Sequence, residues 1–180
     1  MVDGYTPAVF FDRDGTIMHD ANYCSDPKDV HVFPFVAESL RKLRAAGFKL
    51  IMVTNQSGIG RGIFTPEQYN VVHTEVLRQI GEPLIEATYF CPDVPGARSE
   101  CRKPAPGMVL RGAKDNDVDL TRSIFVGDKE IDVQCGHNAG IMAIRVRTGF
   151  ETNTSDSSAD WVAEDFAAAT DIILTKFAPV

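Results

Sequence analysis

The chain has 180 residues, of which 44% are hydrophobic and 24% charged, and its formal net charge is −7. These values are typical of one soluble domain that is long enough to bury a core, so we treat residues 1–180 as a single domain. The acidic balance argues against general nucleic-acid binding, which depends on clustered cations. It also means that an anionic substrate must be bound by cations concentrated in one place.

The sequence gives no sign of a membrane partner or an export signal. No apolar run approaches the roughly 20 residues of a membrane-spanning helix. The first residues, Met1–Tyr5, lack the basic-then-apolar order of a secretion signal, so we expect a cytoplasmic protein. Because no exposed apolar face is obvious, we also expect a monomer. The cysteines are too few and too dispersed for a disulfide framework, which the cytosol would also disfavour: Cys24, Cys91, Cys101 and Cys135.

Strand and helix patterns alternate along the chain. The clearest helix start is at Thr65, Pro66 and Gln68, which form the pattern of an N-cap with a capping box. We predict strands at 8–11, 50–53, 85–90, 123–127 and 141–146, helices at 35–46, 66–80, 106–116, 130–139 and 163–176, and a polar connector at 149–160. The alternation predicts an α/β fold with a mostly parallel sheet covered on both faces. Ligands bind such sheets at the carboxyl ends of the strands.

Two carboxylates, Asp12 and Asp14, directly follow the first strand pattern and lie two residues apart. Side chains at i and i+2 point to the same side of an extended chain, so the two acids converge at the end of the strand. Magnesium takes hard oxygen ligands of this kind and leaves room for waters and a phosphate. Taken alone, such a pattern is more often a strand-to-turn boundary with solvated acids.

Three further segments favour the magnesium interpretation. The second strand pattern ends at Thr54, and the fourth ends at an acid pair, Asp128 and Asp132. Arg102 and Lys103 stand together just before a predicted helix. The order of acid pair, threonine, lysine and second acid pair resembles the haloacid dehalogenase (HAD) superfamily of aspartate-nucleophile phosphatases, over nearly the whole chain.

The HAD resemblance implies a fold and a set of roles. The fold is a Rossmann-like three-layer α/β/α sandwich with a minimal cap, consisting of a flap at 13–33 and a loop at 91–105. Asp12 would be the nucleophile and Asp14 the general acid and base. Asp12, the backbone carbonyl of Asp14 and Asp128 would hold Mg²⁺, while Asp132 either ligates through water or orients Lys129.

Longer strings narrow the resemblance within the superfamily. Residues 12–17, 54–62, 101–108 and 126–129 look like the D-glycero-D-manno-heptose 1,7-bisphosphate 7-phosphatase family, which makes a precursor of bacterial lipopolysaccharide or surface-layer heptose. The resemblance implies a small phosphosugar as partner, with Lys103 as the fixed positive charge on the phosphoryl group. The residues that would contact substrate and phosphate are the flap stretch from Asp20 to Tyr23, Thr54, Asn55, Gln56, Ser57, Arg102, Lys103 and Lys129.

One segment departs from the heptose-type pattern. The family commonly carries a structural zinc on a Cys-x-His … Cys-x-Cys loop, whereas this chain has only Cys91, Asp93 and Cys101 at the corresponding places. Structural zinc strongly prefers four closed nitrogen or sulfur ligands. We therefore expect that zinc is absent and that packing alone holds the loop.

Three alternatives remain beside the heptose assignment. A histidinol-phosphate phosphatase has the same catalytic core, although the glycine-rich continuation at 58–62 favours the heptose type. A non-catalytic phosphosugar-binding protein would have no need of a metal-bound nucleophile. A polynucleotide 3′-phosphatase fits the chemistry, but the acidic chain argues against it.

Overall fold

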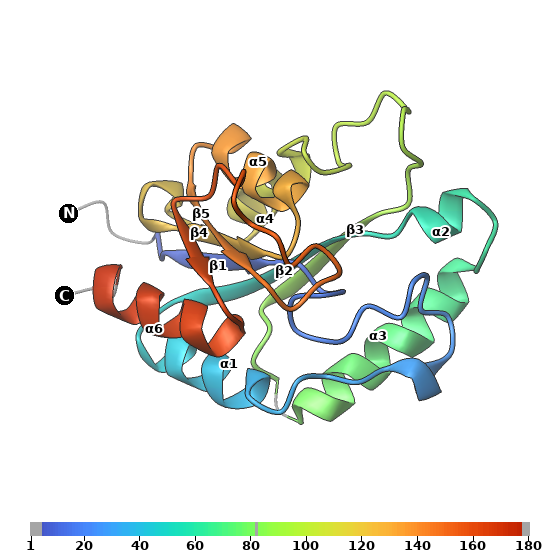
Figure 1. Cartoon of the computed structure of the whole chain (residues 1–180), viewed down its shortest axis with the longest axis horizontal. Helices are drawn as coiled ribbons and strands as arrows, with labels where there is room; N and C mark the ends of the chain where they lie inside the picture. Colours follow the sequence, from blue (N-terminus) through green and yellow to red (C-terminus); the bar gives the residue numbers. More distant parts are fainter. Residues whose placement is uncertain (1–4, 82, 178–180) are drawn as a thin grey trace.

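Six parallel strands form one sheet at the centre of the structure, a computed structural model that describes residues 5–81 and 83–177 (Figure 1). The strand order is β3-β2-β1-β4-β5-β6. The strands are β1 (Ala8–Phe11), β2 (Lys49–Asn55), β3 (Ala87–Cys91), β4 (Ile124–Gly127), β5 (Met142–Val146) and β6 (Trp161–Ala163). The prediction that the chain has no export signal was based mainly on residues 1–4, which lie outside the described residues.

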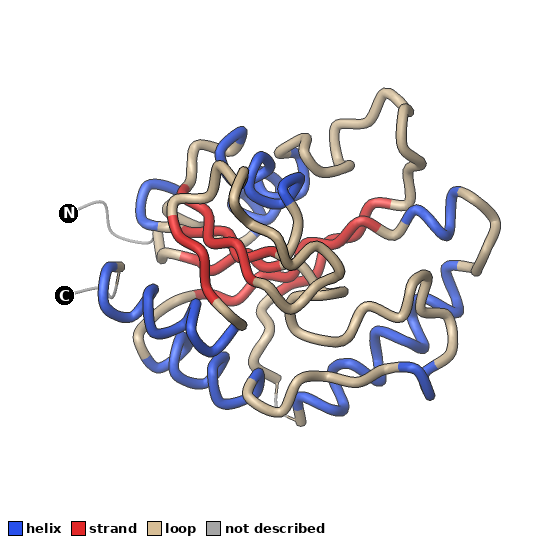
Figure 2. The backbone as a smooth tube through the Cα atoms, in the orientation of Figure 1, coloured by secondary structure: helices blue, strands red, loops and turns tan. Residues whose placement is uncertain are grey.

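Helices cover both faces of this sheet, which confirms the predicted α/β sandwich (Figures 1 and 2). On one face lie α1 (Val36–Ala45), α3 (Pro66–Ile80) and α6 (Phe166–Lys176), and on the other lie α4 (Gly107–Asp115) and α5 (Glu130–Asn138). Alternate strand residues face opposite layers, as the pleat requires. Val9 and Phe11 belong to the core under α1, α3 and α6, whereas Ala8 and Phe10 belong to the core under α4 and α5.

The helix predicted at 66–80 is confirmed with its capping. The Thr65 side chain accepts from the Gln68 backbone N–H, and the Gln68 side chain accepts from the Thr65 N–H. The flap at 13–33 lies along α3 and contains a short 3₁₀ turn at Pro27–Asp29 (Figure 1). The side chain of Gln79 in α3 forms two hydrogen bonds with the flap: it accepts from Val32 N–H and donates to the Val30 carbonyl. The flap is therefore fastened to the helix.

The sequence prediction missed several short elements. Strand β6 and the one-turn helix α2 (Ser57–Gly60) were not predicted, nor was the 3₁₀ turn at Leu120–Arg122. Ala163 ends β6 and does not begin the last helix, which starts at Phe166 after the N-cap Asp165. Segments of three or four residues are too short to show a periodicity. None of the helices in the described part of the chain is long and apolar enough to span a membrane.

Candidate active site

The acids predicted at the carboxyl edge of the sheet do converge there. Asp12 follows β1 and Asp128 follows β4, and these two strands are neighbours in the sheet. The loop before α4 brings Lys103 to the same place, with its Nζ 2.8 Å from Asp12 Oδ1 and 2.7 Å from Asp132 Oδ1. Oxygens of Asp12, Asp128 and Asp132 all lie within 4.8 Å of one another. Residues from distant parts of the sequence thus form one acidic cluster, which contacts Lys103.

This cluster is buried, and burial governs its electrostatics. Burial raises the pKa of Asp12 even though Lys103 opposes the shift. Burial, helped by the negative charges of Asp12 and Asp132, raises the pKa of Asp128 to about 8. For Lys103 burial acts in the lowering direction, but Asp12 and Asp132 outweigh it and raise the pKa. Lys129 and Lys103 favour the charged form of Asp128 but do not outweigh burial and the neighbouring carboxylates.

The cluster has the donor set of a hard divalent cation. Asp128 is fully buried, and its Oδ2 has no hydrogen-bond partner among the described residues. A buried carboxylate oxygen without a partner is costly, and a cation coordinated by several carboxylates removes that cost. Oxygen ligands without sulfur or imidazole suit Mg²⁺. The residues present therefore fit the metal that the sequence predicts.

A pocket of about 200 Å³ opens beside this cluster. Asp14 lines it, as do residues that the sequence predicted to contact substrate: Asp20, Tyr23, Asn55, Gln56, Ser57, Arg102 and Lys129. Asn22, within the predicted flap stretch 20–23, also lines the pocket, and two lining residues were not predicted, namely Cys24 and Ile131. Thr54 and Lys103 do not line the pocket and are almost completely buried. Across the pocket, Lys129 Nζ lies 3.4 Å from Asp20 Oδ2, which joins α5 to the flap.

Known proteins similar to this chain indicate the family to which it belongs. The HAD-hydrolase-like family model matches residues 100–169. The D-glycero-D-manno-heptose-1,7-bisphosphate 7-phosphatase of Thermosynechococcus vestitus is 36% identical over 96% of this chain and 98% of its own length. The crystal structure of the D,D-heptose 1,7-bisphosphate phosphatase of B. bronchiseptica, complexed with magnesium and phosphate, is similar with a TM-score of 0.85. It is 30% identical and covers 94% of this chain and 99% of its own.

The chain belongs to the heptose bisphosphate phosphatase family. Members of this family are HAD phosphatases, which are phosphoric monoester hydrolases, so the predicted superfamily, fold and enzyme class are confirmed. A second relative, the D-glycero-beta-D-manno-heptose-1,7-bisphosphate 7-phosphatase of Yersinia pestis, is 37% identical over 89% of this chain and 92% of its own length.

Asp132 in this HAD phosphatase contacts a different lysine side chain from the one expected. The sequence suggested either ligation of the metal through water or orientation of Lys129, and of these the structure bears on the second: Asp132 Oδ1 lies 2.7 Å from Lys103 Nζ. Its Oδ2 accepts from the backbone N–H of Lys129 at 3.0 Å, which caps α5. Asp132 therefore joins the start of α5 to the buried lysine, and Lys129 turns its side chain toward Asp20.

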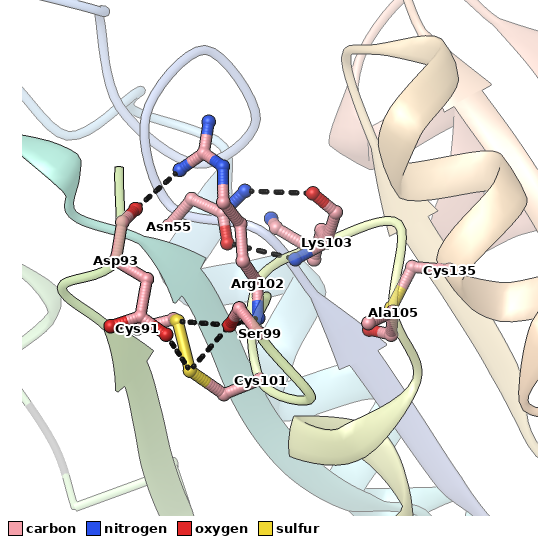
Figure 3. The surroundings of a disulfide bond; sticks show 9 residues. All are labelled: Asn55, Cys91, Asp93, Ser99, Cys101, Arg102, Lys103, Ala105 and Cys135. Carbon is pink, nitrogen blue, oxygen red and sulfur yellow. Dashed lines mark hydrogen bonds between the residues drawn. A yellow bond between two sulfur atoms is a disulfide. The ribbon is translucent and has the colours of Figure 1, made fainter. Parts of the chain in front are cut away.

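Asn55 has a structural role that the sequence did not reveal. Its Oδ1 accepts from Lys103 N–H at 3.0 Å, and its Nδ2 donates to the Lys103 carbonyl at 3.3 Å (Figure 3). These two bonds join the end of β2 to the loop that carries Lys103. The side chain of Asn55 thus fixes the backbone of the predicted phosphate-binding lysine.

The loop at 91–105 is held differently from the prediction. We expected packing alone, but Cys91 and Cys101 form a disulfide (Figure 3). Ser99 Oγ lies 3.6 Å from the Cys91 sulfur and 3.4 Å from the Cys101 sulfur, and it also accepts from Arg102 N–H at 2.9 Å. Asp93 accepts from Arg102 Nη1 through its backbone carbonyl. The cross-link therefore ends one residue before Arg102 and two before Lys103.

Proposed function

We propose that this protein is a Mg²⁺-dependent phosphatase that converts D-glycero-D-manno-heptose 1,7-bisphosphate to heptose 1-phosphate. The observation that carries the proposal is the contact of Lys103 Nζ with Asp12 Oδ1 beside the buried Asp128, whose Oδ2 has no hydrogen-bond partner in the described part of the chain. Phosphoryl transfer to an aspartate requires a nucleophilic carboxylate, a fixed positive charge and a second carboxylate that can coordinate a metal ion, and all three lie at one edge of the sheet. The names of the relatives supply the substrate.

Asp12 would attack phosphorus. Its carboxylate oxygen forms a bond to phosphorus while the bond from phosphorus to the sugar oxygen breaks, and Asp14 gives its proton to the departing oxygen. Asp14 then takes a proton from a water that attacks the aspartyl-phosphate, which releases inorganic phosphate and restores Asp12. Lys103 supplies positive charge to the phosphoryl oxygens throughout. Thr54 and Ser57, with the backbone N–H of Asn55, would donate to the same oxygens.

The residues that would hold Mg²⁺ are Asp12, the backbone carbonyl of Asp14 and Asp128. The bound ion would neutralise negative charge on the phosphate and orient it toward Asp12. Asp132 is already engaged by Lys103, so we assign it to positioning that lysine.

The second phosphate of a bisphosphate needs a cation of its own. Arg102 and Lys129 both line the pocket and can serve. Burial and the neighbouring positive charge of Arg61 lower the pKa of Arg102. Arg61 does not itself line the pocket, but two neighbouring positive charges that repel each other favour an anion between them. This pair supports a substrate with two phosphates over one with a single phosphate, such as histidinol phosphate.

The comparison of kcat/KM for heptose 1,7-bisphosphate, fructose 1,6-bisphosphate and histidinol phosphate tests the substrate. We expect the heptose to be preferred. A preference for histidinol phosphate of more than about tenfold, or roughly 1.4 kcal/mol in the transition state, contradicts the assignment. Asp12→Asn should abolish Mg²⁺-dependent phosphate release while the fold persists. Binding without turnover in the unaltered protein would instead support a non-catalytic phosphosugar-binding protein.

We further propose that the protein contains no zinc and acts as a monomer in the cytoplasm. Metal analysis of protein prepared without chelator and equilibrium sedimentation test the first two points. The Cys91–Cys101 disulfide counts against the compartment, because the cytosol keeps most thiols reduced. Cell fractionation combined with thiol trapping decides that point.

A further inference from the structure

Arg13 is a completely buried arginine to which the proposed reaction assigns no role. It stands between the nucleophile Asp12 and the proton-transfer residue Asp14, and it is among the largest fully buried side chains of the described structure. Burying a guanidinium is costly unless it is paired and hydrogen-bonded. Burial would lower the pKa of Arg13, but Asp14 outweighs it and keeps the group charged. A buried charge of this kind needs a partner, and here the partner is Asp14.

Arg13 holds Asp14 with two parallel hydrogen bonds. Nε donates to Asp14 Oδ2 at 3.1 Å, and Nη2 donates to Oδ1 at 3.1 Å while also lying 3.0 Å from Oδ2. Gln56 adds a third bond, from its Nε2 to Asp14 Oδ2 at 2.9 Å. The same Nε2 donates to Thr54 Oγ1 at 2.9 Å, so Gln56 is itself anchored to β2.

Arg13 and Gln56 together form a clamp on Asp14, and other elements of the fold hold both of these side chains in place. The guanidinium carbon of Arg13 lies 5.5 Å from the centroid of the Tyr69 ring, so the side chain packs against this residue of α3. The Arg13 carbonyl accepts from the N–H groups of Thr16 and Ile17, which closes the turn after β1. The orientation of Asp14 is thus tied to β2, α3 and the turn.

The count of hydrogen bonds distinguishes the two oxygens of Asp14. A carboxylate offers about four acceptor sites, two on each oxygen. Arg13 Nε and Gln56 donate the two hydrogen bonds that Oδ2 accepts, and Nη2 also lies near Oδ2, whereas among the described residues Oδ1 accepts a hydrogen bond from Arg13 Nη2 alone. One site therefore remains open, on Oδ1, and Asp14 lines the pocket.

We propose that Arg13 and Gln56 are positioning residues that hold Asp14 so that its Oδ1 exchanges the proton with the leaving group and then with water. This inference rests on the proposed function, because it takes Asp14 as the acid and base of the reaction. In the first step Asp14 Oδ1 loses its proton to the sugar oxygen as the bond from that oxygen to phosphorus breaks. General acid–base catalysis of this kind contributes about 10²- to 10⁴-fold, and misplacing a group by about 1 Å costs about 10²-fold.

Two substrates with different leaving groups test the clamp. A sugar oxygen needs a proton to depart, whereas the nitrophenolate of p-nitrophenyl phosphate departs without one. We compare the first turnover on each, measured by rapid quench for heptose bisphosphate and by nitrophenolate absorbance for the aryl ester. Arg13→Met and Gln56→Met should slow the first turnover of the sugar ester about 10- to 100-fold and that of the aryl ester less than about threefold. Arg13→Lys keeps the charge without the two-pronged contact and should recover only part of the loss.

The chain offers a matched control. Arg78 binds Glu75 on the exposed face of α3 with the same two-pronged geometry, Nε and Nη2 each 2.7 Å from a carboxylate oxygen. Arg78→Met should leave both first turnovers at the level of the unaltered protein. Far-UV circular dichroism checks the folding of each variant, because a variant that unfolds loses both reactions alike, and only variants with the spectrum of the unaltered protein are compared. If Arg13→Met does not fold, the first-turnover rates of Gln56→Met on the two esters decide whether the clamp positions Asp14.

Asp14→Asn separates failure of the inference from failure of the proposed function. It should slow the sugar ester about 10²- to 10⁴-fold and spare the first turnover of the aryl ester. If Asp14→Asn shows no such selectivity, Asp14 is not the proton donor and the proposed mechanism fails. If Asp14→Asn is selective but Arg13→Met and Gln56→Met slow both esters equally or neither, the clamp is overturned and the mechanism stands.

Discussion

Gly149 approaches Asp128 so closely that a Cβ placed on this glycine would lie 1.9 Å from Asp128 Oδ2. Gly15 approaches the same carboxylate: a Cβ added there would lie 2.5 Å from Oδ2 and 3.2 Å from the Cα of Gly149. Two glycines from distant parts of the chain thus pack against the proposed metal ligand. Thr148 joins the two segments by donating to the Gly15 carbonyl at 2.7 Å. The connector after β5 is therefore part of the wall around the acidic cluster.

Gly149→Ala should impair the metal site, because the new methyl must displace Asp128 or the connector. We expect kcat at saturating Mg²⁺ to fall about 10- to 100-fold and the Mg²⁺ concentration for half-maximal activity to rise. Gly140→Ala is the control: that glycine has φ of 78° and nothing within 4 Å of its added Cβ. The control should lose about 1 kcal/mol of stability from the left-handed backbone, with unchanged Mg²⁺ dependence. Unchanged Mg²⁺ dependence in Gly149→Ala would contradict the role of Gly149.

The Cys91–Cys101 disulfide predicts a thiol count and a stability effect. The native oxidised protein should show, after denaturation, only the two free thiols of Cys24 and Cys135. Cross-linking a short loop restricts the unfolded chain, so reduction should lower the free energy of unfolding by about 2–4 kcal/mol. Urea unfolding with and without reductant measures this difference. The double variant Cys91→Ser with Cys101→Ser should show no response to reductant, and four reactive thiols in the oxidised protein would rule out the cross-link.

Asp132→Asn should weaken catalysis through Lys103. The lysine would lose one of its two charged partners and keep only Asp12, the nucleophile. We expect the free energy of unfolding to fall by about 1–3 kcal/mol. We also expect kcat to fall about tenfold, because a misdirected Lys103 no longer meets the phosphoryl oxygens in the right place. Steady-state kinetics and thermal unfolding measure the two effects, with Asp156→Asn on the exposed connector as the control. A normal kcat in Asp132→Asn would show that Asp12 and the Val53 carbonyl, which also accepts from Lys103 Nζ, suffice to position the lysine.

The sequence predicted the parts of the site that depend on strand ends. Asp12 and Asp128 each follow a buried apolar run, and parallel strands place all such ends on one edge of the sheet. The capping box at Thr65 was predictable because its partners lie three residues apart. These features depend on local pattern, which a single sequence contains.

The features that the sequence did not reveal depend on contacts made only after folding. Asp132 contacts Lys103 and not the Lys129 side chain, because the loop before α4 folds over the end of β1. The pairing of Cys91 with Cys101 depends on the path of the intervening loop, and composition and compartment argued against it. Arg13 lies next to Asp14 in sequence, but only the turn after β1 brings the two side chains face to face. No periodic pattern reports such pairings.

Asp160 should make the stability of the protein depend on pH at the acid end. Burial would raise its pKa, but hydrogen bonds from Ala143 N–H at 2.8 Å and from His137 at 3.0 Å outweigh burial, so the pKa is lowered. The unfolded-state value is near 3.9, so the stabilisation is fully present above about pH 4 and is lost as pH falls through the lower folded-state value. Because the carboxylate is partly exposed, solvent screening limits the effect to about 1 kcal/mol or less. Urea unfolding of the unaltered protein and Asp160→Asn should therefore differ at pH 7 and converge below about pH 4. A difference that grows on acidification would mean that Asp160 is stabilised in its protonated form.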